Sequence, residues 1–592
     1  MGRILVAPLL GCVVVFLISA WPTLTSPLLY SNDGPQHLLQ GFVHGHYEDP
    51  RFGFNELLAL NEPLTSRGYL DLFRWLEPRL GWYDAHRAIL LIAQLLWCSA
   101  WAALVLRLHP DRWPFALLGC ATAIQWAYWL GFVPYFLGLG LTAWSLHLVL
   151  VRPQRRHYGL LAVALLLGCQ VHAFAVAVTG IALLILALFR GLRAVAATVL
   201  AGLPALLFNI SLSAASMHQQ QRLAWDAAFD PVVGVVGRFV GGDQRTTLLF
   251  AGLAVAAVVV GRWARRDRTS RALLVGGLLL LVTGYVAPDE LRGWQLTAPR
   301  YLPLGFALVF ASCPLEHVAA RFRRALGVVV FAFVALHAEW TDFFHRHLGG
   351  ATDPVVALAR RLPPQTGRLW GFLVTTDDLA GTDGTARTRV WPSNLDPWLH
   401  LAQVVAVDLG GQLLFTQAID AAMHAILSAP VFHNHEAEPG WSWAGTWPAV
   451  DVEQRRRNIA AKLDGLRRSA PHLVFVGVEG DDALVEAAGY VIDARVTDGV
   501  RTAVTATFRG CETTIVVPPD VAVVETGAAG TVEADMLRAP DVDGVVVFER
   551  AGCGERWIRV HGAPCGGSSR HPLQQARALF RDGGVLVCPP DR

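Results

Sequence analysis

The sequence predicts a helical protein that crosses a membrane many times and ends in a water-soluble α/β domain. Of its 592 residues, 53% are hydrophobic and only 16% are charged, more apolar side chain than a soluble domain of this length can bury. Long apolar stretches recur through the first 342 residues. From about residue 346 the pattern changes to short β-rich runs bounded by Gly, Pro and Asp.

Eleven of the apolar stretches are long enough to cross about 30 Å of hydrocarbon as helices. They cover residues 4–22, 87–106, 114–131, 134–151, 158–172, 173–189, 195–212, 247–262, 272–287, 301–314 and 325–342. The first has Arg3 before its apolar core but no clear small-x-small cleavage site, so we interpret it as an uncleaved anchor. The fifth and sixth have no loop between them, so one long helix or a re-entrant pair is an alternative.

Arginines mark alternate loops and predict the orientation, because Lys and Arg in short loops stay in the cytoplasm. With eleven spans, these residues fall on one side: Arg3; Arg107 and Arg112; Arg152, Arg155 and Arg156; Arg190 and Arg193; Arg262, Arg265, Arg266, Arg268 and Arg271; Arg321, Arg323 and Arg324. An even number of spans would break this agreement and is disfavoured. The N-terminus is then cytoplasmic, and residues 23–86 and the C-terminal region are extracytoplasmic.

The C-terminal region is predicted to be an α/β domain at 346–508 followed by a small β-rich subdomain at 509–592. Strands are expected at "GRLWGFLV", "HLVFVGV", "YVIDARV", "RTAVTATF", "TTIVVPP", "GVVVFER", "RWIRVHG" and "GVLVCPP". A helix is expected at 451–469, with an Asp cap at its start. Cys511, Cys553, Cys565 and Cys588 fit either disulfides in an oxidising compartment, with three possible pairings, or buried thiols.

The first external loop begins with "SNDGPQH" at residues 31–37, a strong turn and helix-start signal. The following "QHLLQGFVHGHY" is typical of a short amphipathic helix, with His37 and His44 on one face, that lies at the membrane surface with its apolar face down. One interpretation makes Asp33 a helix cap only. The other makes it functional, because a carboxylate at the lipid boundary is less hydrated and can act as a base or bind a divalent ion.

This layout resembles the GT-C glycosyltransferases, which take sugars from polyprenyl-phosphate carriers. The resemblance covers residues 1–345: a first membrane helix, an external loop with an early Asp, and a polytopic body before an extracytoplasmic domain. "ND" at 32–33 stands where that superfamily carries its essential acid, often as a DD, DE or ED pair. Asn32 departs from that doublet, which leaves metal dependence open. "GFVPYFLGLGL" at 131–141, "VHAF" at 171–174, "APRYLP" at 298–303 and "PWLHLAQVVAVDLGG" at 397–411 resemble stretches of uncharacterised bacterial membrane proteins of the same layout.

The resemblance implies a catalytic group of Asp33, His37 and Glu62, in which Asp33 orients the acceptor hydroxyl or accepts its proton. A leaving polyprenyl phosphate needs positive charge, which Arg292 and Arg300 would supply, because a guanidinium donates two hydrogen bonds to phosphate at once. His172 is a further substrate-binding candidate, since an imidazole within a membrane span is costly. The alternatives are an interfacial anchor for Arg300, a backbone hydrogen bond for His172 and a solvent-facing loop position for Glu62.

The expected partners are therefore a polyprenyl-phosphate-linked sugar, membrane lipid and an extracytoplasmic acceptor, with no nucleic acid. Only Lys462 among 49 basic residues is a lysine, which indicates a GC-rich bacterial genome and hence a bacterial plasma membrane. No clear metal motif is found, because the spacing in "VFHNHEAEPGWSWAGTW" at 431–447 is not that of the helical zinc motifs. The alternative function is a non-enzymatic membrane protein: a carrier or flippase for a lipid-linked solute, or a scaffold.

Overall fold

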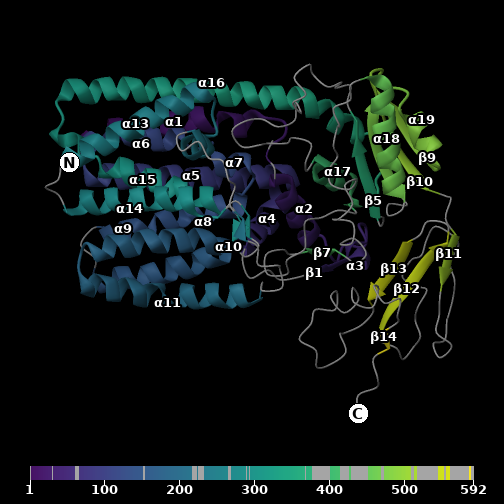
Figure 1. Ribbon diagram of the computed structural model, residues 1–592, viewed down its shortest axis with the longest axis horizontal. Helices are drawn as coiled ribbons and strands as arrows, with labels where there is room; N and C mark the ends of the chain where they lie inside the picture. Colours follow the sequence, from purple (N-terminus) through teal and green to yellow (C-terminus); the bar gives the residue numbers. More distant parts are fainter. Residues whose placement is uncertain are drawn as a thin grey trace, which may run out of the picture.

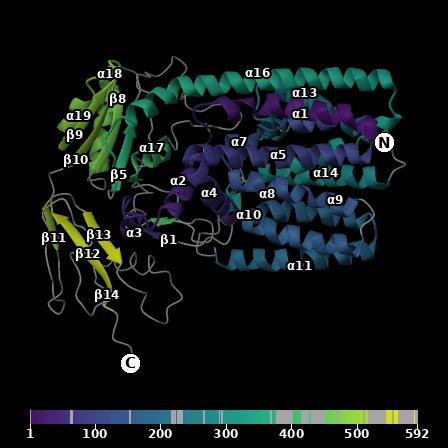
Figure 2. The same cartoon turned by 180° about the vertical axis from the view of Figure 1, so that it is seen from behind.

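The computed structural model has a bundle of long helices and, beyond one end of it, the two larger of its β-sheets (Figures 1 and 2). It describes residues 2–29, 31, 33–60, 66–150, 154–215, 223–224, 233–263, 268–288, 290–291, 294–295, 297–366, 369–375, 401–413, 426–428, 451–467, 472–508, 512–515, 544–551, 555–560 and 586–587. We call the end of the bundle that faces the sheets the sheet end.

Eight helices among the described residues are long and apolar enough to cross a membrane. They are α1 (Gly2–Thr25), α5 (Trp82–Leu108), α8 (Val133–Ala143) with α9 (Ser145–Leu150), α10 (Arg155–Leu188), α11 (Leu192–Ala215), α13 (Gln244–Trp263), α14 (Arg268–Val286) and α16 (Ala320–Ala359). They run roughly side by side along the long axis of the molecule, and α16 continues past the bundle to the sheet (Figure 1). The protein is thus a polytopic α-helical membrane protein in its fold.

Two of the eleven predicted spans are short buried helices. The stretch 114–131 contains α6 (Trp113–Ala121), a turn and α7 (Trp126–Trp129), and the stretch 301–314 contains α15 (Leu302–Ser312). Every residue of α15, and all of α6 after its first residue, is buried. Hydropathy predicted spans here because a helix that is apolar all round looks the same whether lipid or protein surrounds it.

The predicted spans 158–172 and 173–189 form the single element α10, which reverses direction at His172. His172 has extended dihedral angles, φ −164° and ψ 110°. A Cβ built on Gly168 would lie 2.8 Å from Cγ2 of Val176, although eight residues of straight helix span about 12 Å. Beyond the other end, Arg190 donates to the carbonyl of Leu150, which ends α9. The two halves of α10 therefore form a helical hairpin, which agrees with the two separate spans predicted and not with the alternative of one long helix.

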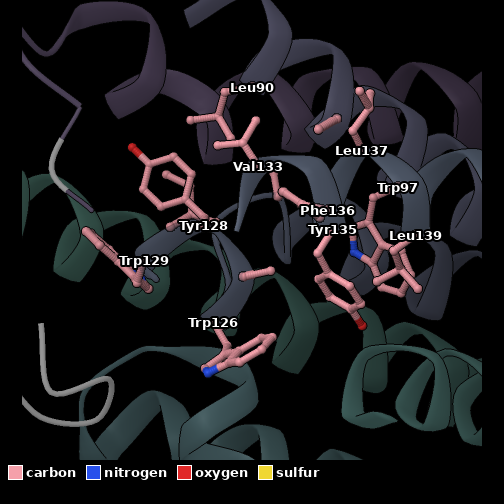
Figure 3. Packing of buried hydrophobic residues seen from close by; sticks show 14 of the residues in the cluster. Leu90, Trp97, Trp126, Tyr128, Trp129, Val133, Tyr135, Phe136, Leu137 and Leu139 are labelled. Carbon is pink, nitrogen blue, oxygen red and sulfur yellow. The ribbon is translucent and has the colours of Figure 1, made fainter. Parts of the chain in front are cut away.

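Aromatic side chains fill the bundle near the sheet end, where the chain between α6 and α8 folds inward (Figure 3). Trp97, Trp129, Tyr128 and Tyr135 are each at most 1% exposed. The indole nitrogen of Trp97 donates to the hydroxyl of Thr122 over 3.1 Å. This dense packing gives the segment one conformation, because interiors packed at crystal density tolerate little rearrangement.

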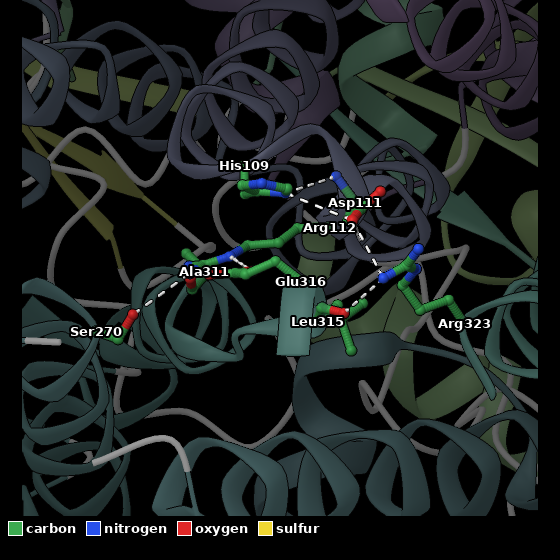
Figure 4. Close-up of polar contacts among 8 residues, drawn as sticks. All are labelled: His109, Asp111, Arg112, Ser270, Ala311, Leu315, Glu316 and Arg323. Atoms are coloured by element: carbon green, nitrogen blue, oxygen red, sulfur yellow. Dashed lines mark hydrogen bonds and ion pairs between the residues drawn. The ribbon is translucent and has the colours of Figure 1, made fainter. Parts of the chain in front are cut away.

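A polar network joins two short turns after α5 and α15 (Figure 4). These turns are η1 (Pro110–Arg112) and η4 (Leu315–His317). Arg112, only 3% exposed, donates to Glu316 over 2.6 Å and to the carbonyl of Ala311 over 2.5 Å. A nearby ion pair joins Arg323 to Asp111 over 3.1 Å. The Arg112 side chain thereby satisfies a carbonyl in the last turn of α15, which would otherwise have no partner in its helix.

The larger sheet has the strand order β6-β5-β8-β10-β9, in which β5 pairs in parallel with β6 and β8 and the remaining pairs are antiparallel. Its strands are β5 (Leu369–Val374), β6 (Gln412–Leu413), β8 (His472–Val478), β9 (Tyr490–Thr497) and β10 (Arg501–Phe508). The helices α17 (Leu401–Leu409), α18 (Val452–Arg467) and α19 (Asp482–Ala487) alternate with these strands. The α/β arrangement predicted within residues 346–508 is confirmed in the described part of that range. The Asp cap of α18 is also confirmed, since Asp451 accepts from the amide of Gln454 over 2.6 Å.

A second sheet contains β11 (Glu512–Ile515), β12 (Gly544–Ala551), β13 (Glu555–Val560) and β14 (Leu586–Val587), at all four remaining predicted strands. The four C-terminal cysteines lie outside the described residues. The boundary predicted at residue 345 falls inside α16, which is continuous from Ala320 to Ala359, so the division into domains stays a prediction. The remaining short elements are α3 (Phe54–Leu57), α12 (Arg238–Val240), η2 (Val233–Gly237), η3 (Ala298–Tyr301), β1 (Leu58–Leu60), β2 (Leu223–Ala224), β3 (Glu290–Leu291), β4 (Trp294–Gln295) and β7 (Ile426–Ser428).

The helix after the opening heptad is α2 (Gly34–Gly45), and the prediction that it lies on the membrane surface is wrong. Nine of its residues are buried, and the helix packs between α4 (Arg67–Leu80), α5 and α17. Gly41 approaches α4 so closely that a Cβ there would lie 2.9 Å from the ring of Phe73. The sequence pattern is amphipathic because His37 and His44 share the less buried side, while protein covers the rest.

Candidate active site

Asp33 is the residue directly before α2, at the sheet end of the bundle. Its amide donates to the carbonyl of Leu130 over 2.9 Å, and its own carbonyl accepts from the amide of His37 over 3.1 Å. The side chain makes no capping hydrogen bond to the helix. The interpretation of Asp33 as a helix cap only is therefore wrong. The backbone of Asp33 is fixed by these two hydrogen bonds, and the residue is half-buried.

The turn that receives Asp33 depends on Gly131. Gly131 has φ +70°, a left-handed conformation that costs other residues about 1–2 kcal/mol. A Cβ at this position would lie 2.1 Å from the amide nitrogen of Gly34 and 2.8 Å from that of Asp33. The first residue of "GFVP" is thus glycine for two physical reasons, its backbone angle and its close approach to the start of α2.

Arg300 lies in η3 with its guanidinium among three aromatic rings. Its Cζ atom is 4.4 Å from the ring centre of Phe132, 5.2 Å from that of Tyr135 and 5.4 Å from that of Phe174. The residue is 6% exposed. Ring faces attract a cation, and this attraction strengthens when water is excluded. The rings therefore fix the plane of the guanidinium.

Asp33 and Arg300 interact electrostatically although they are far apart in the sequence. Burial lowers the pKa of Arg300 to about 10, and the nearby groups of Tyr135 and Asp33 act in the opposite direction. The hydroxyl of Tyr135 also donates to the carbonyl of Arg300. Arg300 keeps its charge at neutral pH, because even the lowered pKa lies well above 7.

His172 stands at the reversal of α10, beside the same aromatic rings. Its ring centre lies 5.4 Å from that of Tyr135, with the planes at 82°, and its side chain interacts electrostatically with both Arg300 and His37. The residue is 7% exposed. The hairpin is tight against α8, since a Cβ on Gly138 would lie 3.0 Å from Cβ of His172.

His37 connects this group to a buried pair that the sequence did not reveal. Its ring centre is 5.7 Å from that of Tyr69 on α4, and the Tyr69 hydroxyl lies 2.7 Å from Nδ1 of His86 on α5. A Cβ on Gly34 would lie 3.5 Å from Nε2 of His86, so this imidazole contacts the same turn as Asp33. Tyr69 and His86 carry no local motif, and only the packing of α4 against α5 brings them together.

Four separate sequence segments therefore meet at one place: the heptad with Asp33 and His37, "GFVPYF", "VHAF" and "APRY". Of the predicted site residues, Asp33, His37, His172 and Arg300 gather there. Glu62 and Arg292 lie outside the described residues. Within the described part of the chain, no group of three or more His, Cys, Asp or Glu side chains has the arrangement of a metal site.

The chemistry of this cluster combines a half-buried carboxylate, a fixed guanidinium and three imidazoles. A carboxylate can accept a proton from a hydroxyl, and an arginine whose guanidinium plane is fixed suits a phosphate. Aromatic rings around both groups reduce hydration and strengthen electrostatic interactions.

Comparison with solved structures gives a likeness of fold. ArnT from Cupriavidus metallidurans is similar in its apo state, with 13% identity over 85% of this chain and 97% of that chain and a TM-score of 0.48. The same protein bound to undecaprenyl phosphate has 14% identity, the same coverage and a TM-score of 0.47. The Archaeoglobus fulgidus oligosaccharyltransferase has 11% identity over 79% of this chain and 69% of that chain, with a TM-score of 0.40. These likenesses concern the fold alone. No family model and no curated protein sequence matches the chain.

Proposed function

We propose that this protein is a membrane glycosyltransferase that moves a sugar from a polyprenyl-phosphate donor to an extracytoplasmic acceptor hydroxyl. The observation that carries the proposal is that Asp33, Arg300 and His172 all lie against the segment 130–135 at one end of the helix bundle. The amide of Asp33 donates to the carbonyl of Leu130, the guanidinium of Arg300 lies over the rings of Phe132 and Tyr135, and the ring centre of His172 is 5.4 Å from that of Tyr135. Sequence segments around residues 33, 131, 172 and 300 all contribute to this one site. Such convergence supports a chemical role better than four separate structural roles do.

In the proposed reaction, Asp33 accepts the proton of the acceptor hydroxyl as that oxygen attacks the anomeric carbon of the sugar. The bond between this carbon and the phosphate oxygen breaks, and the electron pair leaves with the polyprenyl phosphate. The departing group gains negative charge, which Arg300 stabilises. The energy of the bond to phosphate drives the transfer, so no nucleotide is needed.

The burial of Arg300 favours this role over that of an interfacial anchor. An anchor extends its guanidinium toward lipid headgroups and water, whereas Arg300 is 6% exposed and surrounded by rings. A guanidinium with a fixed plane loses little conformational entropy when it binds a phosphate. His172, close to Arg300 and His37, would complete the phosphate-binding side of the site.

The test is transfer of radiolabelled sugar by purified protein in liposomes, with undecaprenyl-phosphate mannose, glucose and arabinose as donors and cell-envelope extract as acceptor. We expect Asp33→Asn to abolish transfer, a loss of at least about 100-fold for a general base, while membrane insertion is unchanged. Asp71→Asn is the matched control, because Asp71 is an exposed carboxylate in the same loop that pairs only loosely with Arg67, over 3.6 Å. Full activity of Asp33→Asn would remove the central residue of the mechanism.

A carrier or flippase is distinguished by the same liposomes without acceptor. A carrier would move undecaprenyl-phosphate sugar between leaflets, and Asp33→Asn would reduce that movement. A transferase leaves the donor in its leaflet and binds undecaprenyl phosphate in a way that depends on Arg300. We therefore expect Arg300→Gln to weaken binding of undecaprenyl phosphate about tenfold or more, the loss of one charge-assisted contact.

A further inference from the structure

Two segments of the C-terminal region contact the first external loop directly. The strand β7 pairs antiparallel with β1 of that loop, with Leu58 opposite Ser428 and Leu60 opposite Ile426. The helix α17 packs against α2. The loop that carries Asp33 is therefore held from the sheet side as well as from the bundle side.

The contact between α17 and α2 contains a buried hydrogen bond. Nε2 of Gln403 donates to Oε1 of Gln36 over 3.2 Å, and each of these residues is 2% exposed. Gln36 lies in the first turn of α2, three residues after Asp33. A displacement of this turn moves Asp33 with it, because the Asp33 carbonyl accepts from the amide of His37.

Polar residues are concentrated on this side of α2. Gln36 and Gln40 are one turn apart and share a face, and Gln40 is 4% exposed. The far side of the helix is apolar and presses Gly41 against Phe73 of α4. An apolar contact alone tolerates sliding, whereas a buried hydrogen bond has a preferred distance and angle, so its loss is costly when α2 shifts.

We infer that Gln403 is a positioning residue for Asp33 and acts through Gln36. The C-terminal region is then part of the active-site framework as well as an appended domain. This inference rests on the proposed function, since it assigns Gln403 a role in the same reaction. It adds that the orientation of Asp33 depends on a side chain 370 positions later in the sequence.

The experiment is a double-mutant cycle with Gln36→Leu, Gln403→Leu and the double variant, in the liposome assay with the donor that the unmodified protein uses. We expect each single variant to lower kcat about tenfold, since a displacement of about 1 Å can cost up to a hundredfold, and to change KM for the donor less than threefold. If Gln403 acts through Gln36, the double variant loses the same factor as either single variant, because the second substitution removes nothing further. Multiplied losses in the double variant would overturn the inference.

Stability must be measured beside activity, because a buried substitution can unfold the protein. Where Gln403→Leu lowers the amount of folded protein, Gln403→Asn replaces it: this side chain keeps its polarity and is too short to reach Gln36. Asp408→Asn is the matched control on the same helix, because Asp408 pairs with Arg360 of the α16 end and not with α2. We expect it to keep kcat within about twofold, the usual effect of a partly exposed ion pair.

The outcomes separate this inference from the proposed function. If Asp33→Asn is inactive while the folded Gln403→Leu and Gln403→Asn variants keep full kcat, the inference is wrong and the proposed function stands. If Asp33→Asn is fully active, the proposed function is wrong, and the inference that rests on it is wrong with it. A loss in kcat with unchanged KM in the two Gln403 variants, but not in Asp408→Asn, supports positioning.

Discussion

Gly131 shows how one residue sets the distance between two segments of the site. The left-handed backbone at φ +70° turns the chain toward α8, and the absent side chain leaves room for the amides of Asp33 and Gly34. Arg300 is set in a different way, by rings from two other segments, Phe132 and Tyr135 on one and Phe174 on the other. Backbone contacts thus hold Asp33, and aromatic rings surround the guanidinium of Arg300.

We predict that Gly131→Ala destabilises the protein and removes transfer activity. The left-handed angle costs about 1–2 kcal/mol, and relief of the steric overlap must move the Asp33 turn. Gly180→Ala is the control, because a Cβ on this helical glycine of α10 meets no atom within 4 Å. Thermal unfolding in detergent, measured beside activity, should show a lower midpoint for Gly131→Ala only. An unchanged midpoint and rate would contradict the role given to the turn.

At the scale of elements, the hairpin in α10 places functional groups at the sheet end without a separate loop. Reversal at His172 leaves its ring beside Tyr135, and the next residues lead to Phe174, which contacts Arg300. The carbonyl of Val171 accepts from the amide of Ser66 over 3.2 Å, so the hairpin tip also contacts the residue before α4. One sharp turn thereby gives contacts to three parts of the site.

The helix α18 buries Lys462, which makes the stability of the sheet region depend on pH. The residue is 4% exposed, and burial lowers its pKa to about 8 from an ordinary 10.5. Between these two values the unfolded chain binds more protons than the folded chain, so stability rises with pH. We predict a rising unfolding midpoint from pH 8 to pH 10.5 that is absent in Lys462→Met, and a higher midpoint for Lys462→Met at pH 7. A parallel pH dependence in both proteins would assign the effect to other groups.

At the scale of the whole molecule, the hairpin in α10 favours an odd number of crossings. Arg190 follows the second half of α10 and donates to the carbonyl of Leu150, which precedes the first half. Arg155 and Arg190 therefore lie at the same end of the hairpin. If each half of α10 crosses the membrane once, the arginines before and after α10 lie on the same side. This agrees with the alternation of arginine-containing loops from which the orientation was predicted. The number of crossings and the side on which each terminus lies stay predictions.

We predict that alkaline phosphatase fused after Arg592 is active and that green fluorescent protein fused there is dark, because the C-terminal region is expected outside the cytoplasm. A fusion truncated after Arg156, in the second arginine-rich loop, should give the opposite pair of results. Fluorescence of the full-length fusion in intact cells would show that the C-terminus is cytoplasmic, the reverse of the predicted topology. It would also place Asp33 on the cytoplasmic side, away from an extracytoplasmic acceptor.

Much of the fold could be predicted because local patterns carry it. All eight predicted strands are present, and the cap of α18 follows from Asp451. The stretches that contain α6 and α15 were predicted as full membrane spans, whereas they form short buried helices, because hydropathy records that a segment avoids water and not whether lipid or protein surrounds it. The same ambiguity misplaced α2 on the membrane surface, since its cover comes from α17, far along the chain.

By itself, the sequence determined that the chain is a polytopic membrane protein with an α/β region, and it singled out Asp33, His37, His172 and Arg300. These are properties of composition, periodicity and short motifs, which act over a few residues. Only the tertiary structure decided that these residues meet, that Tyr69 and His86 join them, and that Gln403 reaches Gln36. Those contacts depend on how the helices pack, and the free energy of that packing is shared among many side chains and is not encoded in any one segment.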